Sequence, residues 1–180
     1  MTIPQANKSN SEDRPIAVLI GAPGAGKSSV GRLLARRLDA EFIDTDALIV
    51  ERAGKPVSDI FIEDGEPHFR TLEADALREA LTRSGAVVSL GGGAIVSEEN
   101  RRALRDHRVV WLKVSPGQAA SRVGLSGARP LLMGNVRGRL VTLLQERTPW
   151  YADLAEVTVD TDDRTVKDIV EEVSGKVLAS

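Results

Sequence analysis

The eight residues from Gly21 to Ser28 have the types and spacing of a loop that binds phosphate. They read GAPGAGKS and fit G-x-x-x-x-G-K-[ST], in which the glycines let successive backbone N–H groups point at one anion. Lys27 would reach the β- and γ-phosphates of a nucleoside triphosphate, and the Ser28 hydroxyl would bind Mg²⁺. The motif predicts a donor nucleotide without identifying the acceptor. Its expected contacts are Gly24, Ala25, Gly26, Lys27, Ser28 and Ser29.

Two carboxylates follow the next apolar run, at Asp44 and Asp46. In an open α/β sheet, ligands bind beyond the carboxyl ends of the strands, so both side chains are expected near the phosphate loop. One could hold Mg²⁺ through water, and the other could accept a hydrogen bond or a proton from an attacking hydroxyl. The alternative is that Thr45 or Asp46 only caps the helix that follows.

A charged turn lies between Phe61 and Phe69, and Arg70 follows it directly. These residues are candidates for binding the acceptor. The two rings could form the walls of an apolar slot, and the guanidinium could take a carboxylate with two hydrogen bonds. Composition alone favours the other interpretation, in which both rings are ordinary core residues and Arg70 is solvated.

Three glycines, Gly91, Gly92 and Gly93, follow an apolar run and would present bare backbone at the ligand edge of the sheet. A flexible turn is the alternative.

Further along, the irregular segment at 123–137 has the character of a lid over an active site. An arginine in or near it, Arg122, Arg129 or Arg147, could neutralise a transferring phosphoryl group, although each taken singly is more typical of a surface residue.

The elements that must position these residues follow from the pattern of apolar residues. Apolar runs predict strands, and helical periodicity predicts helices between them. This alternation predicts a parallel α/β sheet with helices on both faces, and 180 residues suit one domain at 15–180 after a flexible tail at 1–14. The strands are expected at 16–20, 41–43, 86–90, 108–114 and 156–160, and the helices at 27–38, 45–53, 66–83, 97–105, 116–123, 136–147 and 165–178.

Composition narrows the classes of function. A net charge of −2 argues against a nucleic-acid-binding surface, and the lack of cysteine excludes disulfides and thiolate metal sites. No run approaches the roughly 20 apolar residues of a membrane span, and no signal core is present. We therefore expect a cytoplasmic protein that binds neither nucleic acid nor membrane, and we expect a monomer.

Taken together, the motifs resemble the shikimate kinase family over roughly residues 15–178. The GE-x-x-FR and LGGG pieces are more specific than the phosphate loop, which many kinases share. The matching pieces are GAPGAGKS at 21–28, F-x-D-x-D at 42–46, DIF at 59–61, GE-x-x-FR at 65–70, SLGGGA at 89–94, RPLL at 129–132 and R-x-P-x-Y at 147–151.

The resemblance implies a three-layer sandwich of the P-loop nucleoside-monophosphate-kinase type, with a five-stranded parallel sheet, a mobile lid at about 123–137 and a shikimate-binding segment at about 45–75. It implies transfer of the ATP γ-phosphate to the 3-hydroxyl of shikimate, in the pathway to aromatic amino acids, with one Mg²⁺ per site held by Ser28 and Asp44. Lys27, Asp46 and Arg129 would be catalytic.

The remaining roles also follow from the resemblance. Arg70 and Arg147 would bind the shikimate carboxylate, Gly92 of the turn Gly91–Gly93 would supply a backbone donor, and Phe61 and Phe69 would line the ring. Arg122 would stack on adenine, and Arg129 would close onto the phosphates.

Three other interpretations compete with this one. An adenylate kinase would start similarly, but LGGG stands where a D-G-x-P-R stretch would be expected. A gluconate kinase would share the architecture, but its substrate motif is not seen. A regulatory module that binds ATP without turnover would be expected to lose some of the residues Lys27, Ser28, Asp44, Asp46 and Arg129.

Overall fold

The computed structural model describes residues 13–126 and 135–179. Residues 1–12 of the predicted tail and residues 127–134 of the predicted lid, including Arg129, lie outside these ranges.

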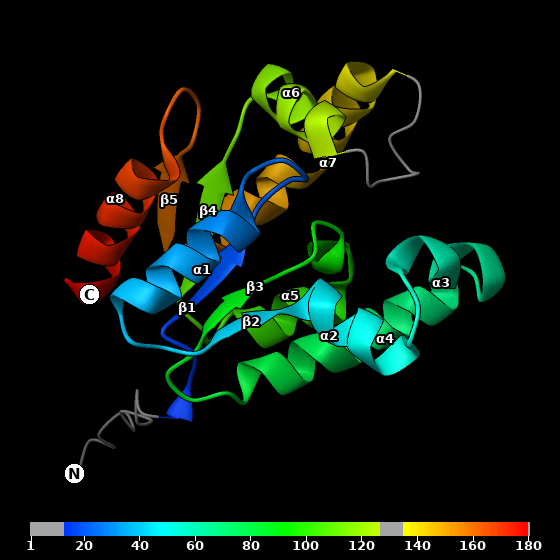
Figure 1. The fold of residues 1–180 in the computed structure, drawn as a ribbon, viewed down its shortest axis with the longest axis horizontal. Coiled ribbons are helices and arrows are strands. Elements are labelled where there is room, and N and C mark those ends of the chain that lie inside the picture. The colour runs from blue at the N-terminus through cyan, green and yellow to red at the C-terminus, as the bar shows by residue number, and fades with distance from the viewer. Residues whose placement is uncertain (1–12, 127–134, 180) are drawn as a thin grey trace, which may run out of the picture.

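A five-stranded parallel sheet forms the centre of the described chain (Figure 1). Its strand order is β2-β3-β1-β4-β5, and every neighbouring pair is parallel, as the sequence predicts. The central strand β1 leads directly into the phosphate loop. The bounds are β1 Ala17–Ile20, β2 Phe42–Asp44, β3 Val87–Ser89, β4 Val109–Lys113 and β5 Val157–Asp160.

Helices connect the strands, and most lie where periodicity predicts them. Their bounds are α1 Lys27–Arg37, α2 Thr45–Ala53, α3 Val57–Glu63, α4 Glu66–Leu81, the 3-10 helix η2 Ala94–Val96, α5 Glu98–Leu104, α6 Pro116–Ser126, α7 Val136–Leu154 and α8 Val166–Leu178.

Three helical features differ from the prediction. The short elements α3 and η2 have too few residues to show a period, and the sequence analysis missed both. The helix expected at 136–147 continues to Leu154, through Pro149. Leu144, Tyr151 and Leu154 are all buried and lie on one side of the helix, so its apolar side extends past Pro149.

The two faces of the sheet have separate apolar cores, because side chains alternate along each strand. Leu19 and Leu112 pack on the face covered by α1 and α8, whereas Val18 and Ile20 pack on the face covered by α4 and α5. Helix α7 contributes to both cores, with Leu140 and Leu144 in the first and Tyr151 and Leu154 in the second. It therefore passes from one face to the other and carries Arg147 between them.

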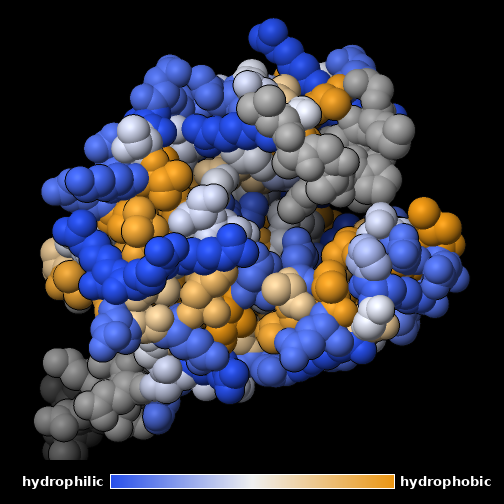
Figure 2. All heavy atoms as spheres, viewed as in Figure 1, coloured by the Kyte–Doolittle hydropathy of each residue, from blue (hydrophilic) through white to orange (hydrophobic). Residues whose placement is uncertain are grey.

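The helices α2, α3 and α4 enclose a third, smaller core made of Ile49, Ile60, Phe69 and Ala76. They form the part of the molecule at the right in Figure 1, and Figure 2 shows a hollow between this part and the part above it that carries α6 and α7. The predicted acceptor-binding segment at 45–75 thus has its own core and forms one side of this hollow.

Candidate active site

The phosphate loop has a backbone that only glycine adopts easily. Gly24 and Gly26 have φ angles of +83° and +87°, and a Cβ on Gly24 would lie 2.7 Å from the Ala119 carbonyl oxygen. Gly26 is the N-cap of α1, and no side chain caps the helix. Its first N–H groups therefore face the loop, as a phosphate site requires.

Lys27 lies folded onto the same loop. Its side chain is buried, and Nζ donates hydrogen bonds to the carbonyl oxygens of Gly21, at 2.8 Å, and Ala22, at 3.1 Å. Ala25 is buried beside it, while Ser29 is exposed. The ammonium group is thus held at the mouth of the loop, where a phosphate would add further acceptors.

Ser28 and Asp44, the two predicted Mg²⁺ ligands, are in contact. Ser28 Oγ donates to Asp44 Oδ2 at 2.6 Å. The other carboxylate oxygen accepts from the backbone N–H groups of Asp46 and Ala47 and so caps α2. These hydrogen bonds fix the carboxylate next to the first turn of α1.

The helix cap differs from the alternative that the sequence left open. Asp44 caps α2, whereas Thr45 is buried and joins α2 to the end of β3. Its Oγ1 donates to the Ser89 carbonyl oxygen at 3.4 Å and accepts from the Gly91 N–H at 3.1 Å. Asp46 is therefore not committed to capping, and its carboxylate faces the glycine turn, where a Cβ on Gly91 would lie 2.5 Å from Oδ1.

A cavity of about 1060 Å³ brings the predicted acceptor contacts together. All eight of them line it, and the phosphate loop contributes Pro23 to the same wall. Glu73 on α4 and several residues of α3 and α7 complete the lining. The eight are Asp46, Phe61, Phe69, Arg70, Gly91, Gly92, Gly93 and Arg147.

Arg70 lies on α4 between two carboxylates. Its Nη1 donates to Glu73 at 2.8 Å, and its Nη2 lies 3.3 Å from Glu66. Its guanidinium also lies against the glycine turn, because a Cβ on Gly93 would come within 2.5 Å of Nη1. The side chain thus lines the cavity and is held by ion pairs, although it is still partly exposed, so it differs from the freely solvated residue that composition favours.

Glu73 is a residue of the cavity that the sequence analysis missed. It is 3% exposed. Burial raises the pKa of its carboxyl group, the Arg70 guanidinium lowers it, and Asp46 raises it. The available signal was its position three residues after Arg70, on the helix face that also carries Phe69 and Ala76.

The two phenylalanines serve both as core and as cavity wall. The ring centroids of Phe61 and Phe69 lie 4.5 Å apart with the planes tilted by 35°. Phe69 is 4% exposed and belongs to the small core of α2, α3 and α4, and the Arg70 guanidinium lies 5.5 Å from its centroid. The two rings therefore belong to the apolar packing of α2, α3 and α4 and also line the cavity.

Arg147 reaches the glycine turn from α7. Its Nη1 donates to the Gly92 carbonyl oxygen at 2.7 Å, and the Tyr151 hydroxyl lies 3.5 Å from the same oxygen. Burial raises the pKa of Tyr151, so its hydroxyl stays protonated. Arg70 and Arg147 thus approach the turn from two helices, a geometry that suits one carboxylate.

Arg122 is turned inward from α6. It donates to the Gly24 carbonyl oxygen at 3.1 Å and to both oxygens of Thr161, at 2.8 and 3.1 Å. The arginine thus links the phosphate loop to the residue that follows β5.

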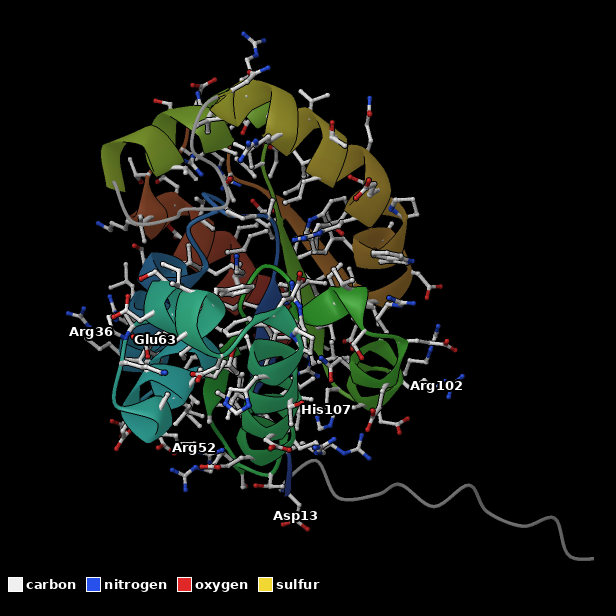
Figure 3. All side chains as sticks on the ribbon, turned by 90° about the vertical axis from the view of Figure 1, so that its right-hand side faces the viewer. Asp13, Arg36, Arg52, Glu63, Arg102 and His107 are labelled. Carbon is white, nitrogen blue, oxygen red and sulfur yellow. The ribbon has the colours of Figure 1, made fainter. Side chains whose placement is uncertain are left out.

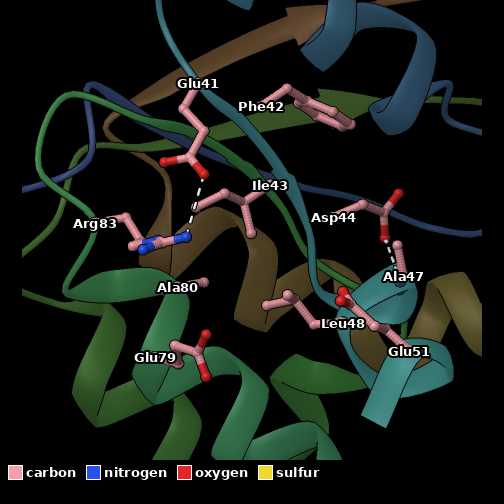
Figure 4. A pocket seen from close by; sticks show the side chains of 10 residues that line it. All are labelled: Glu41, Phe42, Ile43, Asp44, Ala47, Leu48, Glu51, Glu79, Ala80 and Arg83. Carbon is pink, nitrogen blue, oxygen red and sulfur yellow. Dashed lines mark hydrogen bonds and ion pairs between the residues drawn. The ribbon is translucent and has the colours of Figure 1, made fainter.

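A second cavity, of about 290 Å³, lies between β2, α2 and α4 (Figure 4). Its rim includes the ion pair of Arg83 with Glu41, at 3.2 Å, and the carboxylates of Glu51 and Glu79. Of the site residues predicted from the sequence, Asp44 alone is among the described residues that line this cavity. This cavity lies behind Asp44, a predicted Mg²⁺ ligand, and shares no lining residue with the larger cavity.

The fold and the two adjoining sites define a P-loop kinase of the nucleoside-monophosphate-kinase type. A family model described as shikimate kinase matches residues 23–177. The chain belongs to the shikimate kinase family.

Relatives support this assignment across nearly the whole chain. A shikimate kinase of Thermobifida fusca is 54% identical over 167 residues, covering 93% of this chain and 97% of the relative. A second, from Salinispora tropica, is 51% identical and covers 89% of this chain and 96% of its own.

Solved structures agree on the fold. A shikimate kinase from Acinetobacter baumannii in complex with shikimate has a TM-score of 0.88 and 34% identity, covering 92% of this chain and 93% of that chain. A gluconokinase from Sinorhizobium meliloti has a TM-score of 0.57 and 23% identity and so shares the fold alone.

Proposed function

We propose that this chain transfers the γ-phosphate of ATP to the 3-hydroxyl of shikimate, giving shikimate 3-phosphate and ADP, in aromatic amino acid biosynthesis. One observation carries the proposal. A single cavity beside the phosphate loop holds the carboxylate Asp46, the cations Arg70 and Arg147 and the bare glycine turn. A small acidic polyol needs an acceptor for the hydrogen bonds of its hydroxyl groups, cations that bind its carboxylate, and a backbone without side chains that it can approach closely.

The donor half of the site is the phosphate loop. Its backbone N–H groups and Lys27 would bind the ATP phosphates, with phosphate oxygens as further acceptors for Nζ beside its two carbonyl acceptors. Catalysis of this kind depends on positioning and on neutralising charge as the phosphoryl group moves. Arg129 is proposed to add a positive charge from the predicted lid, and Arg122 to pack against the adenine.

Ser28 and Asp44 would hold Mg²⁺. Their oxygens are 2.6 Å apart, and hard oxygen donors from one or two protein residues suit an ion that keeps several waters. When bound, Mg²⁺ neutralises phosphate charge.

Asp46 is proposed to accept a hydrogen bond from the 3-hydroxyl. That oxygen forms a bond to the γ-phosphorus, the bond from the γ-phosphorus to the bridging oxygen breaks, and ADP leaves. The proton of the hydroxyl passes to Asp46 if the carboxylate acts as base. Its position beside Gly91 and two residues after the cap of α2 supports this role.

The carboxylate of shikimate would bind Arg70 and Arg147, with a backbone N–H of the glycine turn as a further donor. The guanidinium groups contact the turn from opposite helices, α4 and α7. Two charge-assisted contacts to one carboxylate would select for an acid over a neutral polyol. Phe61 and Phe69 would pack against the ring.

We further propose that the protein acts as a monomer in the cytoplasm. Among the described residues, no helix combines the length and the apolar character that crossing a bilayer demands.

Coupled ADP release tests the proposal, with ATP, Mg²⁺ and either shikimate, gluconate or AMP as acceptor. We expect turnover with shikimate alone and none from the Lys27→Ala variant, which controls for a contaminating kinase. Turnover with gluconate or AMP but not with shikimate would overturn the proposal. ATP binding without turnover of any acceptor would favour a regulatory module instead.

A further inference from the structure

The segment after the glycine turn is held by two residues of α5 that have no assigned role. Asn100 is buried, and its Nδ2 donates to the Ala94 carbonyl oxygen at 2.9 Å. Arg101 Nη1 donates to the next two carbonyl oxygens, of Ile95 at 2.7 Å and Val96 at 2.8 Å. Three consecutive carbonyl groups of η2 are therefore fixed from one helix.

Arg101 also contacts α7. Its guanidinium carbon lies 4.4 Å from the ring centroid of Trp150, the shortest of the cation–π distances in the described chain. Trp150 is half-buried and lies three residues after Arg147, about one helical turn. Arg101 thus touches both the segment that follows the turn and the helix that carries Arg147.

The contacts on α7 converge on the same short stretch of backbone. Arg147 and Tyr151 both reach the Gly92 carbonyl oxygen, and Trp150 reaches η2 through Arg101. The ring of Tyr151 is fixed in turn by stacking on Trp111, with centroids 5.6 Å apart. Without the Trp150–Arg101 pair, α7 would keep its link to Gly92 and its packing against η2, but it would lose the contact with the side chain that binds the Ile95 and Val96 carbonyl oxygens.

We propose that Arg101 and Trp150 are positioning residues that set the place of the Arg147 guanidinium relative to the glycine turn, and so the affinity for the acceptor carboxylate. The inference rests on the proposed function of Arg147. It assigns the pair no contact with substrate. The effect is expected on the acceptor side, because Arg101 and Trp150 contact each other and Arg101 contacts η2, and both lie apart from the contacts that hold the phosphate loop.

The test compares steady-state kinetics of Arg101→Gln, Trp150→Leu and the double variant. We expect KM for shikimate to rise about three- to tenfold, the range of a partly desolvated cation–π contact, with kcat within about twofold and KM for ATP unchanged. The double variant should lose little more than Arg101→Gln alone, because the contact with Trp150 is already absent in that variant. Trp150→Phe should restore part of the affinity, since a phenyl ring keeps a weaker cation–π contact.

Arg102→Gln is the matched control. It removes the same charge from the adjacent residue of α5, whose side chain is exposed, pairs with Glu98 and points away from the body of the molecule (Figure 3). This variant should behave as wild type. If it raised KM as much as Arg101→Gln, net charge rather than positioning would explain the effect.

The carboxylate itself provides a further measurement. Shikimate methyl ester lacks the negative charge of the acceptor carboxylate, and its inhibition constant as a competitor of shikimate measures binding without that charge. If Arg101 positions Arg147, the ratio of the affinities for shikimate and for the ester should be smaller in Arg101→Gln than in the wild-type protein. An unchanged preference, additive losses in the double variant, or an equal rise in KM for ATP would each overturn the inference. Lack of shikimate turnover by the wild-type protein would instead refute the proposed function, which makes the two failures distinguishable.

Discussion

Gly93→Ala displaces a guanidinium group without straining the backbone. Gly93 has φ −94° and ψ −7°, which lies outside the left-handed region, so the backbone there does not require glycine. The added Cβ would lie 2.5 Å from Arg70 Nη1 and 3.1 Å from Nη2. Ordinary contact needs about 3.5 Å, so the end of the arginine side chain must move by about 1 Å. Because that end is flexible, the fold should accommodate the change.

We expect Gly93→Ala to weaken binding of the acceptor. A hydrogen bond to a charged group contributes about 1.5–3 kcal/mol, so losing one between Arg70 and the acceptor carboxylate should raise KM for shikimate about 10- to 150-fold. KM for ATP should stay the same, and the free energy of unfolding should change by less than about 0.5 kcal/mol.

A double-mutant cycle with Arg70→Ala is the assay. Steady-state kinetics with varied shikimate would be measured for both single variants and the double variant, with thermal unfolding alongside. Gly93→Ala should have almost no further effect once Arg70 is gone, because the added methyl group acts through that side chain. Additive effects, or a KM for ATP that rises with KM for shikimate, would refute the placement of Arg70 against the turn.

Three further predictions concern other parts of the molecule. Lys27→Ala should abolish ATP binding and turnover but leave shikimate binding in isothermal titration largely intact; loss of both would contradict the separation of the two half-sites. Gly24→Ala should lower the free energy of unfolding by about 1–3 kcal/mol in urea titration, because its positive φ and the nearby Ala119 carbonyl oxygen both disfavour a Cβ; a neutral result would be inconsistent with this loop conformation. His107 lies at the end of the molecule where the described chain begins (Figure 3), and its Nδ1 is buried with no partner among the described residues. Burial lowers the pKa of its imidazole below the ordinary 6.5, so unfolding takes up a proton and stability should fall as the pH falls below about 6.5. Denaturant titrations from pH 8 to pH 5 should show a smaller fall for His107→Leu, and equal pH dependence would count against this cause.

The sequence was most informative where function depends on local backbone. The phosphate loop needs glycine at Gly24 and Gly26 for reasons internal to the loop, so the pattern alone predicts it. Long apolar runs and helical periods predicted the five strands and most helices in the same way. The α3 helix and η2 were missed because they are too short to show a period.

The missed parts of the site depend on contacts between elements distant in sequence. The spacing of Glu73 from Arg70 and Phe69 could indicate its helix face, but not that its carboxylate is buried close enough to Asp46, on another helix, to interact with it. Asp44 was expected to bind metal, but its second role as the cap of α2 depends on how β2 ends. The contact of Arg101 with Trp150 joins α5 to α7, and a pattern of neighbouring residues cannot reveal it.

The identity of the phosphorylated hydroxyl tests the central claim most directly. Phosphorus–proton correlation spectra of the product from ATP and shikimate would show which ring proton couples to the new phosphate. We predict coupling to the proton on C3, with ADP formed in equal amount. A phosphate on the 4- or 5-hydroxyl, or ADP formed without any phosphorylated shikimate, would contradict the account.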